Sequence, residues 1–216
     1  GITIVVSPLI SLMIDQVKAL NEAGVHAAYI NSALTENQIT KALYNAMCGR
    51  YKIVYVAPER LETNRFLEFV LNADISMITI DEAHCISQWG QDFRPSYLKI
   101  VNLIKMLPKR PVVSAFTATA TQAVKDDIVC VLGLNNPFIK VTGFDRSNLY
   151  FEVRQPNNKD AEVLNYVLSH RDDSGIIYCA TRKNVDKVYA MLAKNGIAVT
   201  RYHAGLDNDM RKANQE

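Results

Sequence analysis

The feature that most constrains the fold is a regular alternation of short apolar runs with longer amphipathic stretches between Ile2 and Leu132. Apolar runs of about five residues are typical of buried strands, whereas apolar residues spaced three and four apart are typical of one helix face. When such segments alternate, the strands form a parallel sheet and the helices cover both of its faces. We therefore expect an α/β fold built on a parallel sheet.

The predicted elements follow from this alternation and from helix-capping signals. Thr35 precedes an amphipathic stretch and Gln38 follows three residues later, which predicts a capping box at the start of a helix. The predicted strands span residues 2–7, 25–30, 52–56, 75–80 and 111–115, and the predicted helices span 9–23, 35–47, 64–71, 97–107 and 121–132.

The alternation stops after Leu132, and a polar, turn-rich stretch follows from Gly143 to Asp160. Turn-forming residues between periodic segments are typical of a linker. We predict a first domain over residues 1–142, a linker over 143–158 and a second domain over 159–216. The alternation restarts in the second domain, with helices predicted at 159–170, at 184–195 and after Gly205, and strands at 175–179 and 197–202.

Charge and cysteine content narrow the possible partners. The 24 basic and 22 acidic residues leave a net charge of +2, so any nucleic-acid binding must come from local placement of charge. No apolar run approaches the roughly 18 residues that span a bilayer, so we expect no membrane partner. Four cysteines without a C-x-x-C pair argue against a zinc site and a disulfide framework, and they fit a reducing compartment.

The first chemistry-bearing motif is the acid pair Asp81-Glu82, which directly follows the apolar run 75–80 and precedes Ala83-His84. Ligands of open α/β sheets bind at the carboxyl ends of the strands. There Asp81 could hold Mg²⁺, and Glu82 could orient and deprotonate a water that attacks a phosphoryl group. A solvated pair of acids at a strand end is the alternative, but the position after a buried strand favours catalysis.

A second motif, SAFTATA at residues 114–120, follows the next predicted strand. The hydroxyls of Ser114, Thr117 and Thr119 could bridge two ligand sites by hydrogen bonds. An ordinary strand-to-helix turn, with Thr119 or Thr121 as the helix cap, is the alternative. The acid pair one strand earlier favours the functional interpretation.

A third motif is the segment from Cys85 to Pro95, which we call the aromatic-rich loop. It contains the only tryptophan of the chain, together with Phe93 and Arg94, in a mostly polar sequence with a glycine and a proline. Aromatic side chains in polar loops can stack on unpaired bases, and an arginine adds phosphate contact. The alternative is that Trp89 and Phe93 pack into the core, but the loop composition favours the surface.

Together these motifs resemble the superfamily-two helicases, and the RecQ family in particular. The run DEAHCISQWGQDFRP, residues 81–95, is similar to motif II of that family with its aromatic-rich loop. Further blocks agree in order along essentially the whole chain: VVSPLISLMIDQV at 5–17, VYVAPERL at 54–61, SAFTATAT at 114–121, GFDRSNL at 143–149, GIIYCATR at 175–182 and YHAGL at 202–206.

The resemblance implies a motor of two RecA-like lobes that binds ATP and Mg²⁺ between them and moves 3′ to 5′ along single-stranded DNA. It would unwind duplex DNA in repair and recombination. Asp81 and Glu82 would then bind Mg·ATP, His84 would link the ATP site to the DNA side, and Ser114, Thr117 and Thr119 would couple them. The implied DNA contacts are Gln88, Trp89, Phe93, Arg94, Arg60 and Ser7; for Arg60 an ordinary turn role is an equal alternative.

The sequence also departs from the family pattern. A helicase needs G-x-x-x-x-G-K-[ST] to cradle phosphates, yet none of the nine glycines is followed by lysine. We expect that motif, with the first strand, before residue 1, and the arginine finger, a zinc module and a winged-helix domain after Glu216. The chain would then be a fragment with a truncated first lobe and the start of a second, with no zinc and no activity of its own.

Two other functions stay open. One is a DExH-type RNA helicase, against which the aromatic-rich loop argues. The other is a non-catalytic nucleic-acid-binding module on a helicase fold, against which the intact acid pair and SAFTATA run argue. The expected partners are single-stranded and partly duplex DNA. The expected compartment is the bacterial cytoplasm, at the nucleoid, or the nucleus if the source is eukaryotic.

Overall fold

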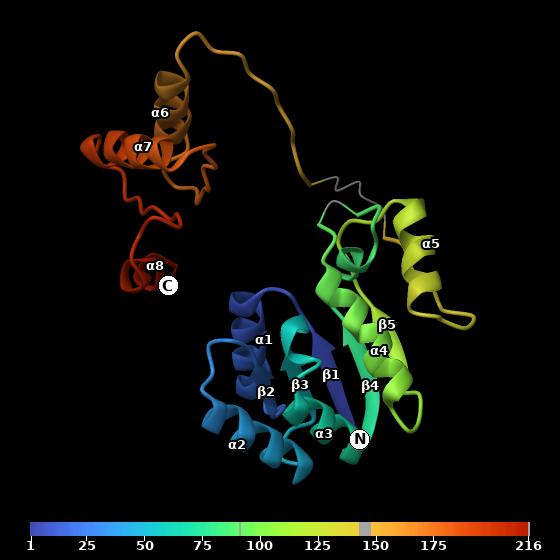
Figure 1. Ribbon diagram of the computed structural model, residues 1–216. Coiled ribbons are helices and arrows are strands. Elements are labelled where there is room, and N and C mark those ends of the chain that lie inside the picture. The colour runs from blue at the N-terminus through green and yellow to red at the C-terminus, as the bar shows by residue number, and fades with distance from the viewer. Residues whose placement is uncertain (91, 143–147, 216) are drawn as a thin grey trace. The chain divides into compact units, whose positions relative to one another are not determined.

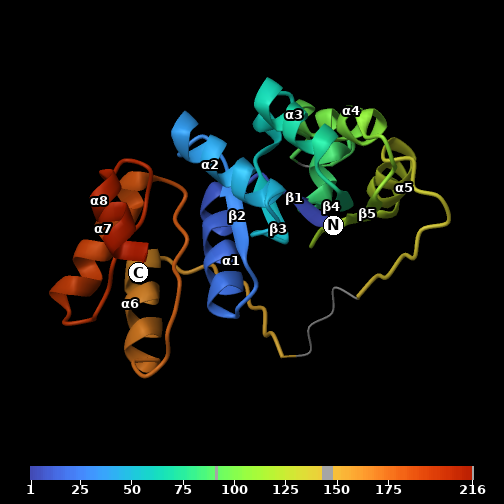
Figure 2. The same cartoon turned by 90° about the horizontal axis from the view of Figure 1, so that it is seen from below.

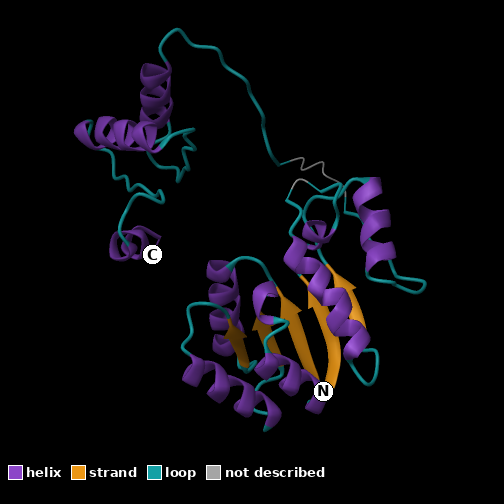
Figure 3. Ribbon diagram, viewed as in Figure 1, coloured by secondary structure: helices purple, strands orange, loops and turns teal. Residues whose placement is uncertain are grey.

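The computed structural model describes residues 1–90, 92–142 and 148–215, and in them five parallel strands form a sheet (Figures 1 and 3). The strand order is β2–β3–β1–β4–β5. The strands are β1 Ile2–Val6, β2 Ala27–Ile30, β3 Ile53–Val56, β4 Ile75–Ile80 and β5 Val112–Ala115. The predicted α/β class and parallel sheet are confirmed.

The carboxyl ends of the strands are aligned across the sheet. Val6, the last residue of β1, pairs with Val56 of β3 and with Ile80 of β4. Ile80 in turn pairs with Ala115, the last residue of β5. Residues that directly follow β1, β4 and β5 therefore meet at one edge of the sheet.

Helices cover both faces of this sheet (Figure 2). Successive residues of a strand point to opposite faces: Ile4 and Val6 belong to the larger core cluster, whereas Val5 belongs to a smaller one with Met13 and Val17 of α1. The other helices of the first unit pack on the larger cluster. The helices are α1 Ile10–Glu22, α2 Glu36–Met47, α3 Asn64–Asn72, α4 Leu98–Met106 and α5 Gln122–Val131, with short 3-10 turns η1 Pro58–Arg60, η2 Ala83–Ile86 and η3 Pro95–Tyr97.

The predicted capping box at the start of α2 is confirmed. The Thr35 hydroxyl accepts a hydrogen bond from the Gln38 backbone N–H at 3.4 Å, and the Gln38 side-chain oxygen accepts one from the Thr35 backbone N–H at 2.8 Å. The other predicted strands and helices of residues 1–132 are also present, with ends that differ by one or two residues. No helix in the described part of the chain combines the length and apolar content needed to cross a bilayer.

The chain divides into two compact units, Gly1–Val141 and Thr142–Glu216. The second unit contains α6 Lys159–Ser169, α7 Arg182–Lys194 and α8 Asn208–Gln215. The predicted linker 143–158 and the GFDRSNL block include residues 143–147, which lie outside the described residues. The assignment of this unit as the start of a second lobe stays a prediction.

The two strands predicted in the second unit are wrong. Residues 175–179 and 197–202 are without regular secondary structure. A strand exists only where a neighbour supplies its backbone hydrogen bonds, and neither segment has a strand partner among the described residues. Their apolar side chains instead stay open to solvent: Tyr178 is 92% exposed, and Ile176, Ile197 and Val199 line a cavity of about 830 Å³.

Candidate functional site

The acid pair lies where the central strands of the sheet end. Asp81 directly follows β4, and its backbone N–H donates to the Val6 carbonyl at 2.9 Å, which extends the pairing with β1. On the other side, the Phe116 N–H donates to the Ile80 carbonyl and the Ala83 N–H donates to the Phe116 carbonyl, both at 2.8 Å. The backbone around the acids is therefore held from both neighbouring strands.

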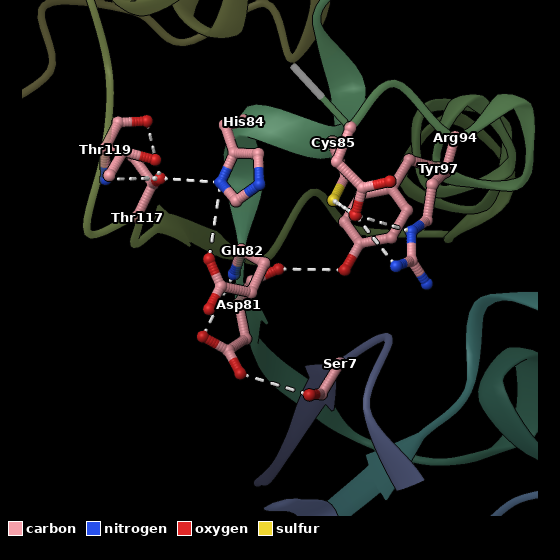
Figure 4. Close-up of polar contacts among 10 residues, drawn as sticks. Ser7, Asp81, Glu82, His84, Cys85, Arg94, Tyr97, Thr117 and Thr119 are labelled. Atoms are coloured by element: carbon pink, nitrogen blue, oxygen red, sulfur yellow. Dashed lines mark hydrogen bonds and ion pairs between the residues drawn. The ribbon is translucent and has the colours of Figure 1, made fainter. Parts of the chain in front are cut away.

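The carboxylate of Asp81 is half-buried and held in one orientation (Figure 4). The Ser7 hydroxyl donates to its Oδ2 atom at 3.1 Å, and the Glu82 backbone N–H donates to its Oδ1 atom at 3.0 Å. A fixed carboxylate at a strand end suits a hard cation such as Mg²⁺, which prefers oxygen ligands. Asp81 can thus serve as the metal ligand that the sequence predicts.

Ser7, which we expected at the DNA, is fully buried. Its side chain lies at the end of β1, next to β4, and its hydroxyl is used by Asp81. A hydroxyl without solvent access is not available to a DNA strand, so direct DNA contact is the wrong role for it. We reassign Ser7 to the orientation of Asp81.

Glu82 adopts an unusual backbone conformation. Its φ of 47° and ψ of 47° lie in the left-handed region, which costs a residue with a Cβ atom on the order of 1–2 kcal/mol. Such strain persists only where the surroundings hold it, and it gathers at functional sites. The conformation ends β4 abruptly and starts η2, so His84 falls two residues from Glu82 on the same side of the turn.

His84 joins the first two predicted motifs. Its Nδ1 atom lies 2.9 Å from the Thr117 hydroxyl and 3.3 Å from a carboxylate oxygen of Glu82. The Thr117 hydroxyl donates its proton to the Thr119 carbonyl at 3.1 Å, so it accepts from His84, and the imidazole carries its hydrogen on Nδ1. The same Nδ1–H group also lies 3.3 Å from the Glu82 carboxylate, so Thr117 and Glu82 share one donor.

The three hydroxyls of the SAFTATA run do not share one environment. Thr117 contacts His84, and Thr119 contributes its backbone carbonyl to Thr117. Ser114, by contrast, pairs with Thr79 of β4, with 2.9 Å between the two hydroxyl oxygens. The structure therefore brings Thr117, with Thr119 behind it, to the acid pair, and leaves Ser114 inside the sheet.

The aromatic-rich loop starts inside η2 and carries its tryptophan on the surface. Trp89 is 76% exposed, and Gln88 is also exposed, whereas Phe93 and Arg94 are half-buried. The core-packed alternative for Trp89 is thus wrong. Gly90 lies tight against the start of the loop, because a Cβ atom there would meet the His84 carbonyl oxygen at 2.5 Å.

The side chain of Arg94 is bound inside the loop. Its Nε and Nη2 atoms donate to Asp92 at 3.1 and 2.8 Å, and this guanidinium lowers the pKa of the Asp92 carboxyl. The buried thiol of Cys85 also points to Asp92, with 3.8 Å between Sγ and Oδ2. Burial, reinforced by the Asp92 carboxylate, raises the pKa of Cys85 to about 11.

One group of possible metal ligands stands out among the described residues. Ligand atoms of His84, Cys85 and Asp92 lie within 4.8 Å of one another. A metal would need the thiolate of Cys85, whose raised pKa keeps the thiol protonated, and it would have to displace Arg94 from Asp92. These side chains fit the loop's own hydrogen bonds better than they fit an ion.

Arg60 lies in η1, just after β3, and is bound to α2. Its Nη1 atom lies 3.6 Å from Glu36, which also receives Arg65 at 3.0 Å. The two arginines and Glu36 line a cavity of about 210 Å³. Arg60 is partly exposed, so a contact with a phosphate would compete with Glu36 for it.

Tyr97 is a residue of the site that the sequence did not indicate. It is fully buried at the end of η3, and its hydroxyl donates to the backbone carbonyl of Asp81 at 3.0 Å. In the sequence it is one of ten tyrosines, at the start of an amphipathic stretch. No local pattern predicts a hydrogen bond across 16 residues.

Comparisons with known proteins agree along the chain. Residues 1–127 match the DEAD/DEAH box helicase family. Over 216 residues the chain is 49% identical to the ATP-dependent DNA helicase RecQ of Bacillus subtilis, and the match covers 100% of this chain and 36% of that protein. It is 40% identical to the bifunctional 3′-5′ exonuclease/ATP-dependent helicase WRN of Mus musculus, covering 98% of this chain and 15% of that protein. The chain spans about a third or less of the length of such relatives.

Two solved structures share the fold at low sequence identity. Dbp5 of S. cerevisiae bound to RNA and ADP BeF3 has a TM-score of 0.62 and 18% identity, covering 100% of this chain and 54% of that one. The Mycobacterium smegmatis helicase Lhr bound to ssDNA and AMP-PNP has a TM-score of 0.61 and 14% identity, covering 99% of this chain and 32% of that one.

Proposed function

The chain belongs to the DEAD/DEAH box helicase family, and from this premise we propose that it forms part of a RecQ-type motor that couples ATP hydrolysis to movement along DNA. The whole-chain matches to RecQ helicases confirm the predicted RecQ resemblance. The activity of the complete protein is our proposal. It includes 3′-to-5′ unwinding in repair and recombination, in the cytoplasm of a bacterium at the nucleoid.

The observation that carries this proposal is the set of side-chain contacts Ser7–Asp81 and Glu82–His84–Thr117 at the carboxyl ends of the strands. Bound ATP with Mg²⁺ would supply the phosphoryl group and offset its charge. Asp81, fixed by Ser7, would hold the metal ion. Glu82 would orient the attacking water and accept its proton, with its carboxylate aimed by the Nδ1–H group of His84.

The aromatic-rich loop supports DNA as the substrate. Trp89 offers an exposed indole face on which a base can stack. Arg94 lies in the same loop, where a phosphate would compete with Asp92 for its guanidinium. The loop begins inside η2, which also contains His84, so the surface proposed to meet DNA is continuous with the group that aims Glu82. This continuity favours a DNA-stimulated ATPase over a non-catalytic binding module.

The proposal is tested with Glu82→Gln in the full-length protein. This change keeps the size of the side chain but removes the proton acceptor, so we expect DNA-stimulated ATP hydrolysis to fall by at least about a hundredfold while ATP still binds. Glu68→Gln on the exposed face of α3 is the matched control. Turnover that survives Glu82→Gln would contradict the assigned role. Equal stimulation by RNA and DNA would instead support an RNA helicase.

A further inference from the structure

We propose that Tyr97 is a positioning residue that connects the aromatic-rich loop to the acid pair. This inference deepens the proposed function and rests on it. Tyr97 touches neither nucleotide nor DNA in this proposal. It acts through the one peptide group that separates the two acids.

The hydroxyl of Tyr97 has a single proton to donate. It donates that proton to the carbonyl oxygen of Asp81 at 3.0 Å (Figure 4). The ring is 0% exposed and belongs to the larger core cluster, so the hydroxyl has no water to exchange for this acceptor. Burial also raises the pKa of Tyr97, which keeps the hydroxyl a neutral donor at any pH at which the protein would be assayed.

The peptide group between Asp81 and Glu82 is held at both ends. Its carbonyl accepts from Tyr97, and its N–H donates to the Oδ1 atom of Asp81 at 3.0 Å. The orientation of this peptide sets the φ angle of Glu82, which is 47°. A left-handed glutamate relaxes to an ordinary conformation unless its surroundings resist. The Tyr97 hydrogen bond supplies such resistance and so fixes the direction of the Glu82 carboxylate.

Tyr97 is also tied to the loop through its backbone. Its N–H donates to the Arg94 carbonyl at 2.9 Å, and the Arg94 N–H donates to the Cys85 carbonyl at 2.9 Å. These bonds link the end of the loop to its start. If DNA draws Arg94 away from Asp92, the backbone of Arg94 moves, and Tyr97 follows in η3. A movement of the loop would thereby shift the Tyr97 hydroxyl and, with it, the Asp81–Glu82 peptide group that orients Glu82.

The test is Tyr97→Phe in the full-length protein, which removes one hydroxyl and keeps the buried ring. Misplacement of a catalytic group by a fraction of an ångström lowers the turnover rate but not substrate binding. We expect kcat for DNA-stimulated ATP hydrolysis to fall by about tenfold, with KM for ATP and Kd for single-stranded DNA both within about twofold of the original protein. Tyr51→Phe is the control, since Tyr51 is partly buried but lies just before β3, at the amino ends of the strands, away from the acid pair.

The outcomes separate this inference from the proposed function. If Glu82→Gln abolishes turnover but Tyr97→Phe leaves kcat within twofold, the Tyr97 inference is overturned and the proposed function stands. If Tyr97→Phe raises KM or Kd as much as it lowers kcat, Tyr97 is a general packing residue and the inference is again overturned. If Glu82→Gln has no effect on turnover, the proposed function is overturned, and the Tyr97 inference, which rests on it, is overturned with it. A loss confined to kcat, absent in Tyr51→Phe, supports the inference.

Discussion

The Nδ1 atom of His84 lies 2.9 Å from the hydroxyl oxygen of Thr117, although 33 residues separate them in the sequence. The contact exists because β4 and β5 are adjacent and parallel, with Ile80 paired to Ala115, so that the residues after each strand emerge side by side. It fixes the imidazole in the tautomer that can donate toward Glu82.

Thr117→Val should lower the DNA-stimulated ATPase rate of the full-length protein by roughly tenfold. Valine has the shape of threonine but offers no acceptor for the His84 N–H, so the imidazole loses its fixed orientation. Steady-state kinetics with and without DNA measure the effect. Thr40→Val on the exposed surface of α2 is the control. Unchanged kinetics in Thr117→Val would show that His84 needs no such partner.

Trp89→Ala should weaken the binding of single-stranded DNA by roughly tenfold or more, because stacking of a base on an aromatic ring contributes about 1–3 kcal/mol. The melting temperature should hardly change, since the indole is 76% exposed. Fluorescence anisotropy of a labelled oligonucleotide, repeated at two salt concentrations, measures the affinity. Phe138→Ala, at another exposed aromatic residue, is the control. Equal affinities in the two variants would refute the stacking role.

Cys85 should resist alkylation in the folded protein. Its pKa of about 11 leaves roughly one thiol in a thousand ionised at pH 8, and only the thiolate reacts. Exposed Cys48 and Cys130 should therefore react with iodoacetamide more than about a hundredfold faster, as mass spectrometry of peptides would record. The difference should vanish in urea. Comparable rates in the folded state would mean that the loop opens readily.

The 216-residue chain by itself should show no measurable ATP hydrolysis. Within its sequence no G-x-x-x-x-G-K-[ST] run occurs, and backbone N–H groups in such a run are what cradle the phosphates. A coupled-enzyme assay on the purified chain, with the full-length protein as the positive control, measures this. Turnover by the chain that disappears in Glu82→Gln would contradict the expectation.

The first unit could be predicted from the sequence because each of its elements has a local signal. Strands β1 to β5 are apolar runs bounded by turns, and α2 begins at a capping box formed by Thr35 and Gln38. The second unit could not be predicted as well, because the runs 175–179 and 197–202 have the composition of strands but no neighbour to pair with among the described residues. Composition indicates what a segment can form, and partners decide what it does form.

The candidate site was predictable in its members but less so in their contacts. Asp81 and Glu82 follow from their place after a strand, and Trp89 from a polar loop. The burial of Ser7 and the hydrogen bond of Tyr97 depend on which strand lies beside which and on a turn 16 residues away. These relationships arise only when the sheet is assembled, so no local pattern carries them.

Gly90 is a position at which the placement of the aromatic-rich loop can be changed without changing a residue of the acid pair. Since an added methyl group would collide with the His84 carbonyl oxygen, Gly90→Ala would push the loop away from η2 without replacing any acid, hydroxyl or aromatic side chain of the site. A series of growing side chains at this one position would spread the loop from η2 in steps. Gly90 thus sets the spacing between the loop that carries Trp89 and the turn η2 that carries His84.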